Sequence, residues 1–170
     1  MPLNLTVGIT SPKIPESTFL AQNATIVGDV VLGEHCSIWF QAVVRGDVNK
    51  IIIGDKVNIQ DGAIIHCSYQ KAATLIGNNV SIGHRAIVHG CKIEDDVLIG
   101  MGAIVMDNVI VGTGSIVAAG AVVLENIKIP PYTIYAGVPA REVKKMNPEE
   151  AKEVIRKTAD NYVLYKTWFE

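Results

Sequence analysis

The 170-residue sequence predicts an all-β solenoid of six-residue repeats, followed by one C-terminal α-helix. Two observations predict this architecture. A large aliphatic residue recurs every six positions from Leu20, and a helical pattern of apolar residues begins only after Asn147. An α-helix requires a period of about 3.6 residues and a flat strand a period of 2, so neither explains the repeat.

The chain is expected to form one domain over residues 1–170, in which 1–18 is an irregular N-terminal cap and 19–140 is the solenoid. The repeat has nineteen members with three breaks of phase: Leu20, Ile26, Leu32, Ile38, Val44, Ile53, Ile59, Ile65, Ile76, Ile82, Val88, Ile93, Ile99, Val105, Val111, Val117, Val123, Ile129 and Tyr135. A six-residue unit cannot bury its own apolar side chain, so each unit must stack on its neighbours.

Three flat rungs per turn close a triangular prism, and nineteen rungs make about six turns. The residues near Asn49–Lys50 and the stretch 66–75 are expected to leave the prism as loops. This organisation resembles the left-handed parallel β-helix of hexapeptide-repeat proteins. The resemblance implies the handedness, since the usual crossover rule predicts right-handed connections.

The predicted C-terminal helix covers residues 148–167. Asn147 is a favourable N-cap, Pro148 suits the first turn, and two glutamates follow at the positive end of the helix dipole. Apolar residues from Ala151 to Tyr162 then recur at helical spacing, Val154 among them, so the helix is expected to lie along a prism face.

The composition narrows the class of protein. Fifteen basic and seventeen acidic residues give a net charge of −2, which predicts no nucleic-acid partner. No apolar run approaches the ~20 residues that a membrane span requires, and the first residues lack a signal-peptide pattern. Three cysteines are an odd number, which argues against a disulfide framework. We expect a soluble, reduced, cytoplasmic protein.

The repeat register places three polar residues in one column. Every third rung returns to the same face of the prism, so Arg45, His66 and His89 each follow the aliphatic residue of a stacked rung. Neighbouring rungs lie ~4.8 Å apart, which allows two imidazoles to contact one metal ion.

The register places His84 on the neighbouring face, above Gln60 and Asp61. A prism corner separates it from His66 and His89 of the same chain. Packing of prisms around a three-fold axis would bring these three histidines together between subunits. Three histidines with an open fourth position form the zinc arrangement that produces hydroxide near neutral pH.

Other polar residues leave alternatives open. Arg45, Asp47 and Asp61 form either an interface ion-pair network or part of the site. Asn58 and Gln60 are either turn residues or hydrogen-bond donors to a bound anion.

Two further residues are expected to take no part in the chemistry of the site. His35 is interpreted as a surface or interface residue. Cys67 follows His66 but occupies a different position in the repeat, which favours a packed thiol over a metal ligand.

The motifs carry a family resemblance. They are Val44-Arg45-Gly46-Asp47, Asn58-Ile59-Gln60-Asp61-Gly62 with His66, Ile82-Gly83-His84, Val88-His89-Gly90-Cys91 and Ala136-Gly137-Val138-Pro139-Ala140. With these residues the chain resembles the gamma-class carbonic anhydrases of the small bacterial and archaeal branch. The resemblance implies a homotrimeric zinc lyase, with Fe²⁺ or Co²⁺ as other metals, in which His66 and His89 of one subunit and His84 of the next hold the ion.

The same resemblance implies the reaction and its residues. Metal-bound hydroxide attacks CO2 to form bicarbonate. Gln60 orients the hydroxide, Asn58 helps to position it, and Tyr162 reaches the site from the C-terminal helix. Arg45 pairs with one of the acids named above and supports the trimer.

One departure from the family's archetype bears on the rate. The loop 67–73 contains no acidic residue, and Val48 follows Asp47 where the archetype has a glutamate. Without a carboxylate to export the proton, hydration is expected to be slow. The alternatives are a hexapeptide-repeat acyltransferase or acyl-CoA thioesterase with a histidine base, and a non-catalytic trimeric scaffold that binds metal.

Overall fold

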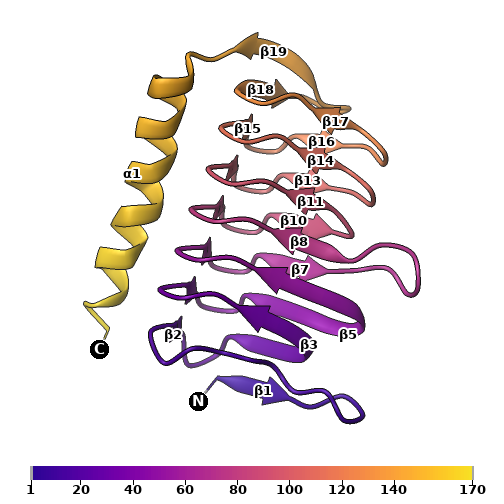
Figure 1. Ribbon diagram of the computed structural model, residues 1–170, viewed down its shortest axis with the longest axis vertical. Coiled ribbons are helices and arrows are strands. Elements are labelled where there is room, and N and C mark those ends of the chain that lie inside the picture. Colours follow the sequence, from indigo (N-terminus) through magenta and orange to yellow (C-terminus); the bar gives the residue numbers. More distant parts are fainter. Residues whose placement is uncertain (1, 170) are drawn as a thin grey trace.

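The computed structural model describes residues 2–169 as a parallel β-solenoid of three faces with one helix beside it (Figure 1). This is the left-handed β-helix with a C-terminal helix that the sequence predicts. The first face stacks β1 (Leu3–Leu5), β3 (Thr25–Leu32), β5 (Val43–Ile53), β7 (Ile64–His66), β10 (Ile87–His89), β13 (Ile104–Val105) and β16 (Val122–Val123).

The second face continues from the first, because β3 and β5 run across the corner between them. It adds β8 (Thr74–Ile76), β11 (Lys92–Ile93), β14 (Ile110–Val111) and β17 (Lys128–Ile129). The third face stacks β2 (Phe19–Leu20), β4 (Ser37–Ile38), β6 (Asn58–Ile59), β9 (Ser81–Ile82), β12 (Leu98–Ile99), β15 (Ile116–Val117) and β18 (Thr133–Ala136). The solenoid therefore has about seven turns, where the sequence predicted about six. Antiparallel β19 (Arg141–Lys145) ends the stack.

The N-terminal segment is less irregular than expected. Residues 3–5 form β1, which pairs in parallel with β3, and the Leu3 amide donates to the Ala24 carbonyl at 2.9 Å. The backbone at the end of the stack gains hydrogen-bond partners in this way. Leu3 and Leu5 are exposed, so this strand lacks the inward side chain by which the repeat is recognised.

The expected loop near Asn49–Lys50 is instead part of β5. This strand pairs with β3 on both sides of a register shift between Gly28 and Val30, and residues 47–50 have no partner in that register. The extra residues therefore form an irregularity within β5. Gly28 has φ +75°, and a Cβ there would lie 2.4 Å from the Gly46 carbonyl oxygen. The two glycines thus permit a close backbone approach at this irregularity.

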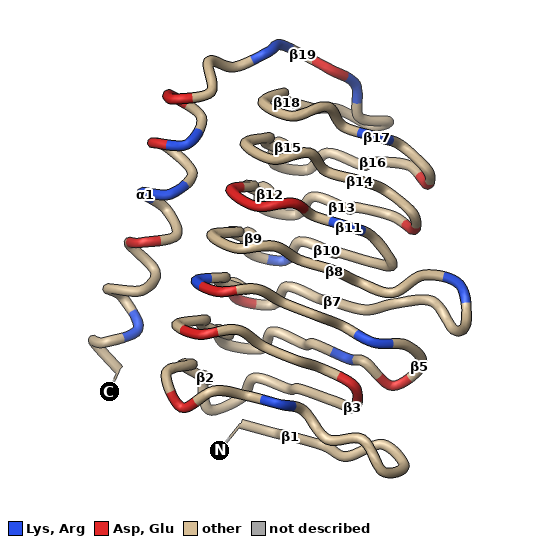
Figure 2. Tube along the Cα trace, viewed as in Figure 1, with Lys and Arg blue, Asp and Glu red and all other residues tan. Residues whose placement is uncertain are grey.

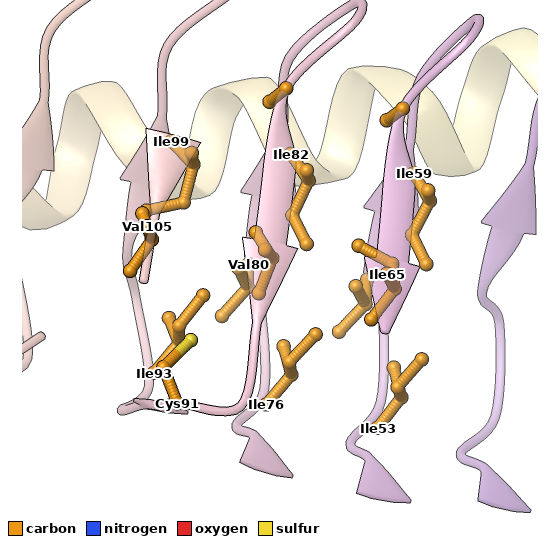
Figure 3. Close-up of a cluster of buried hydrophobic side chains, with 14 of the residues drawn as sticks. Ile53, Ile59, Ile65, Ile76, Val80, Ile82, Cys91, Ile93, Ile99 and Val105 are labelled. Carbon is orange, nitrogen blue, oxygen red and sulfur yellow. The ribbon is translucent and has the colours of Figure 1, made fainter. Parts of the chain in front are cut away.

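Columns of aliphatic side chains fill the prism (Figure 3). Ile59, Ile82 and Ile99 occupy corresponding positions in successive strands of the third face, and all three are fully buried. Full burial of such a side chain contributes about 1.5–3 kcal/mol, and each column repeats this contribution at every turn.

Helix α1 (Pro148–Lys166) runs back along the third face towards the N-terminal turns (Figure 1). Its N-cap Asn147 accepts hydrogen bonds from the amides of residues 149 and 150. Ala151, Ile155 and Ala159 are buried, whereas Val154, which the helical pattern placed on the apolar face, is 52% exposed. Arg156 binds both oxygens of buried Asp96 at 2.9 Å.

Figure 2 shows both signs of charge mixed along α1 and at the prism corners. Within residues 2–169, no helix combines the length and the apolar character that crossing a membrane requires.

We predict that Ile53→Ala lowers the free energy of unfolding by about 2–5 kcal/mol, because it leaves a cavity in an interior column. Ile52→Ala is the matched control on the same strand: Ile52 is 41% exposed and Ile53 only 2%, so the control should cost less than about 1 kcal/mol. Urea unfolding at equal protein concentration measures both, and equal losses would contradict the assignment of the interior.

Candidate metal centre

His66 and His89 lie directly above one another on the first face. Strands β7 and β10 pair in parallel with these two residues opposite each other, which is the register that the repeat predicts. His66 Nδ1 lies 3.0 Å from His89 Nε2, and the ring centroids are 5.0 Å apart. Arg45 follows Val44, and Val44 pairs with Ile65 of the next turn.

A carboxylate holds the outer nitrogen of each ring. His66 Nε2 donates to Asp47 Oδ1 at 3.1 Å, and His89 Nδ1 donates to Asp107 Oδ1 at 2.5 Å. The other oxygen of Asp47 receives the Arg45 guanidinium at 2.5 Å. The pair of rings therefore lies between two carboxylates, each of which accepts a hydrogen bond from one ring.

The surroundings shift the pKa values of three groups at this pair, Asp47, His66 and Asp107. Burial lowers the pKa of His66, and the positive charge of Arg45 acts in the same direction. Burial opposes ionisation of Asp47, but hydrogen bonds from His66 and Arg45 outweigh it and lower the pKa of that carboxyl. Hydrogen bonds from Ser68 and His89 likewise lower the pKa of Asp107 against the effect of burial.

This arrangement leaves two lone pairs facing each other. If each neutral ring donates its one N–H to its carboxylate, both inner nitrogens are acceptors, and acceptors 3.0 Å apart repel unless a proton or a metal cation lies between them. Nitrogens that bind one tetrahedral zinc ion at 2.0–2.1 Å are ~3.3–3.4 Å apart. The donor set and its spacing therefore fit two positions of a zinc site. Among residues 2–169, no three His, Cys, Asp or Glu side chains of one chain are arranged so that together they could hold a metal ion.

His84 lies at a different corner, between the third and first faces. Its Nδ1 is 2.8 Å from Asp61 Oδ2, and both side chains are more than two-fifths exposed. The structure thus brings Asp61 to His84, while Arg45 pairs with Asp47. Asp47 and Asp61 therefore lie at two different corners of the prism.

Asn58 and Gln60 lie near the His84 corner in an ordered chain of amides. Gln60 Nε2 donates to Asn58 Oδ1 at 2.9 Å, and Asn58 Nδ2 donates to Ser81 Oγ at 2.7 Å. All three side chains are buried on the third face. Because this bond uses one N–H of Gln60, the carbonyl oxygen and the second N–H are the groups that this amide can offer to another molecule.

Tyr162 projects from α1 onto the same end of the third face. Its ring packs edge-on against Trp39 at 5.4 Å between centroids. Burial, with the charge of Asp61 as a smaller cause, raises the pKa of Tyr162 to about 12. A hollow of about 320 Å³ lies here, lined by Trp39, Phe40, Asp61, Tyr162, Tyr165, Trp168 and Phe169. Tyr162 therefore belongs to the His84 side and not to the His66–His89 pair of its own chain.

Cys67 is a packed thiol, as expected. It is buried, its Sγ lies 3.1 Å from the Asn49 carbonyl oxygen, and burial raises its pKa. His35 lies between β3 and β4, at the corner between the second and third faces, and has φ 58°.

The sequence analysis did not identify Asp107 or Ser68. A signal was present, because Val105 pairs with Val88 and Asp107 follows it by two residues, one turn above His89. The column of Arg45, His66 and His89 was defined by the position directly after each aliphatic residue, and in this turn that position is Met106. Ser68 lies in the loop after β7, which the repeat does not constrain.

The sequence is similar to a known repeat family and to known proteins. The profile of the family "bacterial transferase hexapeptide (six repeats)" matches residues 90–125. A protein of Methanocaldococcus jannaschii named "probable carbonic anhydrase" is 47% identical over 150 residues, which cover 88% of this chain and 93% of that protein. "Gamma carbonic anhydrase 2, mitochondrial" of Arabidopsis thaliana is 41% identical over 158 residues, or 90% of this chain. The alignment covers 56% of that plant protein, so the chain spans just over half its length.

A solved structure has nearly the same fold. It is described as a hexapeptide transferase family protein from Anaplasma phagocytophilum. It superposes with a TM-score of 0.93 at 36% sequence identity, covering 99% of this chain and 98% of the other.

Proposed function

The chain belongs to the gamma-class carbonic anhydrase family, and from this premise we propose that it is a lyase that hydrates CO2 to bicarbonate at metal sites between the subunits of a homotrimer. The observation that carries the proposal is the His66–His89 pair, with its outer nitrogens on carboxylates and its inner nitrogens 3.0 Å apart. A bound Zn²⁺, or Fe²⁺ or Co²⁺ on the same ligands, would act as a Lewis acid that lowers the pKa of water towards neutrality.

Exposure of the histidines supports a site shared between chains. His84 is 43% exposed and His89 34%, so both remain open to a second copy, whereas His66 is 16% exposed and sits deeper. In the proposed trimer, the His84 corner of one chain meets the His66–His89 pair of the next. Asp61 would orient the His84 ring as Asp47 and Asp107 orient the other two.

The polar residues around His84 would contact the attacking water and the bicarbonate product. The Gln60 carbonyl oxygen would accept a hydrogen bond from the attacking water and so orient its oxygen lone pair. Asn58, held by Ser81, keeps the Gln60 amide in that orientation. Tyr162 stays protonated at neutral pH because its pKa is about 12, so its phenol would donate a hydrogen bond to a bicarbonate oxygen.

The absence of acids from the loop between β7 and β8 governs proton release in the proposed reaction. Each hydration liberates one proton, and a carboxylate near the site usually accelerates such a transfer. Residues 67–73 offer none, so this loop provides no proton relay, and we expect the proton to pass to a buffer molecule.

An acyltransferase is the second candidate, because the Anaplasma protein of 36% identity is described as a transferase. Such an enzyme would use one histidine as a general base and would need no metal. A scaffold would bind metal at the same histidines and hydrate no CO2.

We predict that His66→Ala and His84→Ala each abolish stoichiometric metal binding, because two histidines do not hold zinc tightly. His35→Asn is the matched control, since Asn tolerates the positive φ of that corner, and it should keep about one metal per chain. Elemental analysis of protein purified without chelators measures the content.

Co-expression of the His66→Ala and His84→Ala chains separates a shared site from a site within one chain. In random mixed trimers about a quarter of the sites combine an intact pair with an intact His84, so metal binding should return to that extent. Full metal content in the His84→Ala protein alone would contradict the shared site.

We predict that CO2 hydration by the metal-loaded protein increases with buffer concentration, because buffer accepts the proton. Gln70→Glu places a carboxylate in the exposed loop and should raise the rate at low buffer concentration, whereas Gln70→Asn should not. Stopped-flow hydration assays measure both. Metal-loaded protein without hydration at any buffer concentration would favour the scaffold, and acyl transfer by metal-free protein would favour the transferase.

A further inference from the structure

Asp107 is the polar residue next to the histidine pair that neither the repeat pattern nor the family motifs identify. We propose that Asp107 is a positioning residue that holds His89 in the tautomer whose Nε2 lone pair faces His66. The inference rests on the metal site of the proposed function. It states that the Asp107 carboxylate orients His89 for metal binding.

The Asp107 carboxylate is itself fixed at both oxygens. Oδ1 accepts the His89 Nδ1 proton at 2.5 Å, and Oδ2 accepts the hydroxyl of Ser68. With a separate donor on each oxygen, the carboxylate cannot rotate without losing a hydrogen bond. Ser68 follows His66 by two residues. The same short segment therefore carries the His66 ring and the hydroxyl that holds Asp107 beside His89.

The backbone beside His89 leaves room for this carboxylate. A Cβ at Gly90 would lie 2.3 Å from Asp107 Oδ1, and Gly90 adopts φ +54°, which disfavours other residues. The Asn108 amide donates to the Gly90 carbonyl at 2.7 Å, which ties the two strand ends together. The close approach of Asp107 to Gly90 is a separate observation from the hydrogen bonds, and it indicates the same position for the carboxylate.

The chemistry follows from the single proton of a neutral imidazole. A free ring distributes this proton over both nitrogens, and only the form protonated at Nδ1 has a lone pair at Nε2. A carboxylate at Nδ1 selects that form and aligns the ring. Removal of such a partner typically lowers metal affinity about 10- to 100-fold.

Glu125 provides a matched control. It lines the same hollow of about 370 Å³ as Ser68, His89 and Asp107, but its carboxylate makes no hydrogen bond to the ring among the contacts of the described residues. Glu125→Gln therefore removes a nearby negative charge and leaves the Asp107–His89 hydrogen bond in place.

The test compares Asp107→Ala, Asp107→Asn and Glu125→Gln with the wild-type chain. Long-range ¹H–¹⁵N NMR of histidine-labelled, metal-free protein, above the ordinary His pKa of about 6.5, reports which nitrogen of His89 carries the proton. Competition with a chromophoric chelator reports the affinity for Co²⁺.

We expect Asp107→Ala to lose the Nδ1–H form and to bind Co²⁺ about 10- to 100-fold more weakly. Asp107→Asn retains a carbonyl oxygen that accepts the Nδ1 proton, so it should keep the tautomer and lose less affinity. Glu125→Gln should resemble the wild type in both measurements. Circular dichroism of each variant checks that the solenoid persists. Where the alanine variant unfolds, Asp107→Leu takes its place, because leucine is close to aspartate in size and has no hydrogen-bond acceptor.

An unchanged tautomer in the Asp107 variant that lacks an acceptor, or a loss in Glu125→Gln equal to that in this variant, would overturn the inference. Failure of the proposed function is distinguishable. A wild-type chain that binds metal without hydrating CO2 would refute the reaction and leave the role of Asp107 standing. A wild-type chain that binds no metal would refute the site, and the tautomer of the metal-free protein would still decide whether Asp107 positions His89.

Discussion

The hydrogen-bonded stacking of rungs in one parallel register is the constraint on which the rest of the structure depends. Each turn repeats the backbone of the turn below, so residues far apart in sequence but equal in phase become neighbours. His66 and His89 are 23 positions apart and still meet because strands β7 and β10 pair directly. The buried aliphatic columns fix that register, since a slip by one residue would turn them towards solvent.

The same constraint keeps each chain from completing a three-histidine site. A prism has flat faces and sharp corners, and a solenoid of short strands cannot fold one corner onto another. His84 therefore stays with Asp61 at its own corner, while His66 and His89 occupy a different one. In the proposed enzyme, catalysis therefore requires assembly, because the site exists only where two chains meet.

Sequence periodicity was informative wherever side chains face the interior. It predicted the column of His66 and His89, the separate position of His84 and the helix start at Asn147, since each follows from the phase of buried residues or from capping chemistry. It missed β1 because Leu3 and Leu5 are exposed, so that strand is held by backbone hydrogen bonds that no side-chain pattern records.

Outward polar residues were the harder part of the site. Asp107 lies just beyond β13 and Ser68 in the loop after β7, where the repeat no longer dictates the direction of a side chain. In the folded chain, Ser68 contacts Asp107 and Asp107 contacts His89. The path of β5 through Asn49 was missed for a related reason, because inserted residues bend a strand or leave the sheet according to local glycine geometry, such as that at Gly28.

The central claim is that a metal ion joins two chains through these histidines. Anomalous diffraction at the zinc absorption edge, from crystals grown with zinc, tests it most directly. One strong peak per chain, bound by His66 and His89 of one copy and by His84 of a neighbouring copy at about 2.0–2.1 Å, is the predicted result. A peak elsewhere, or crystals of zinc-saturated protein with no peak at the histidine pair, would contradict the claim.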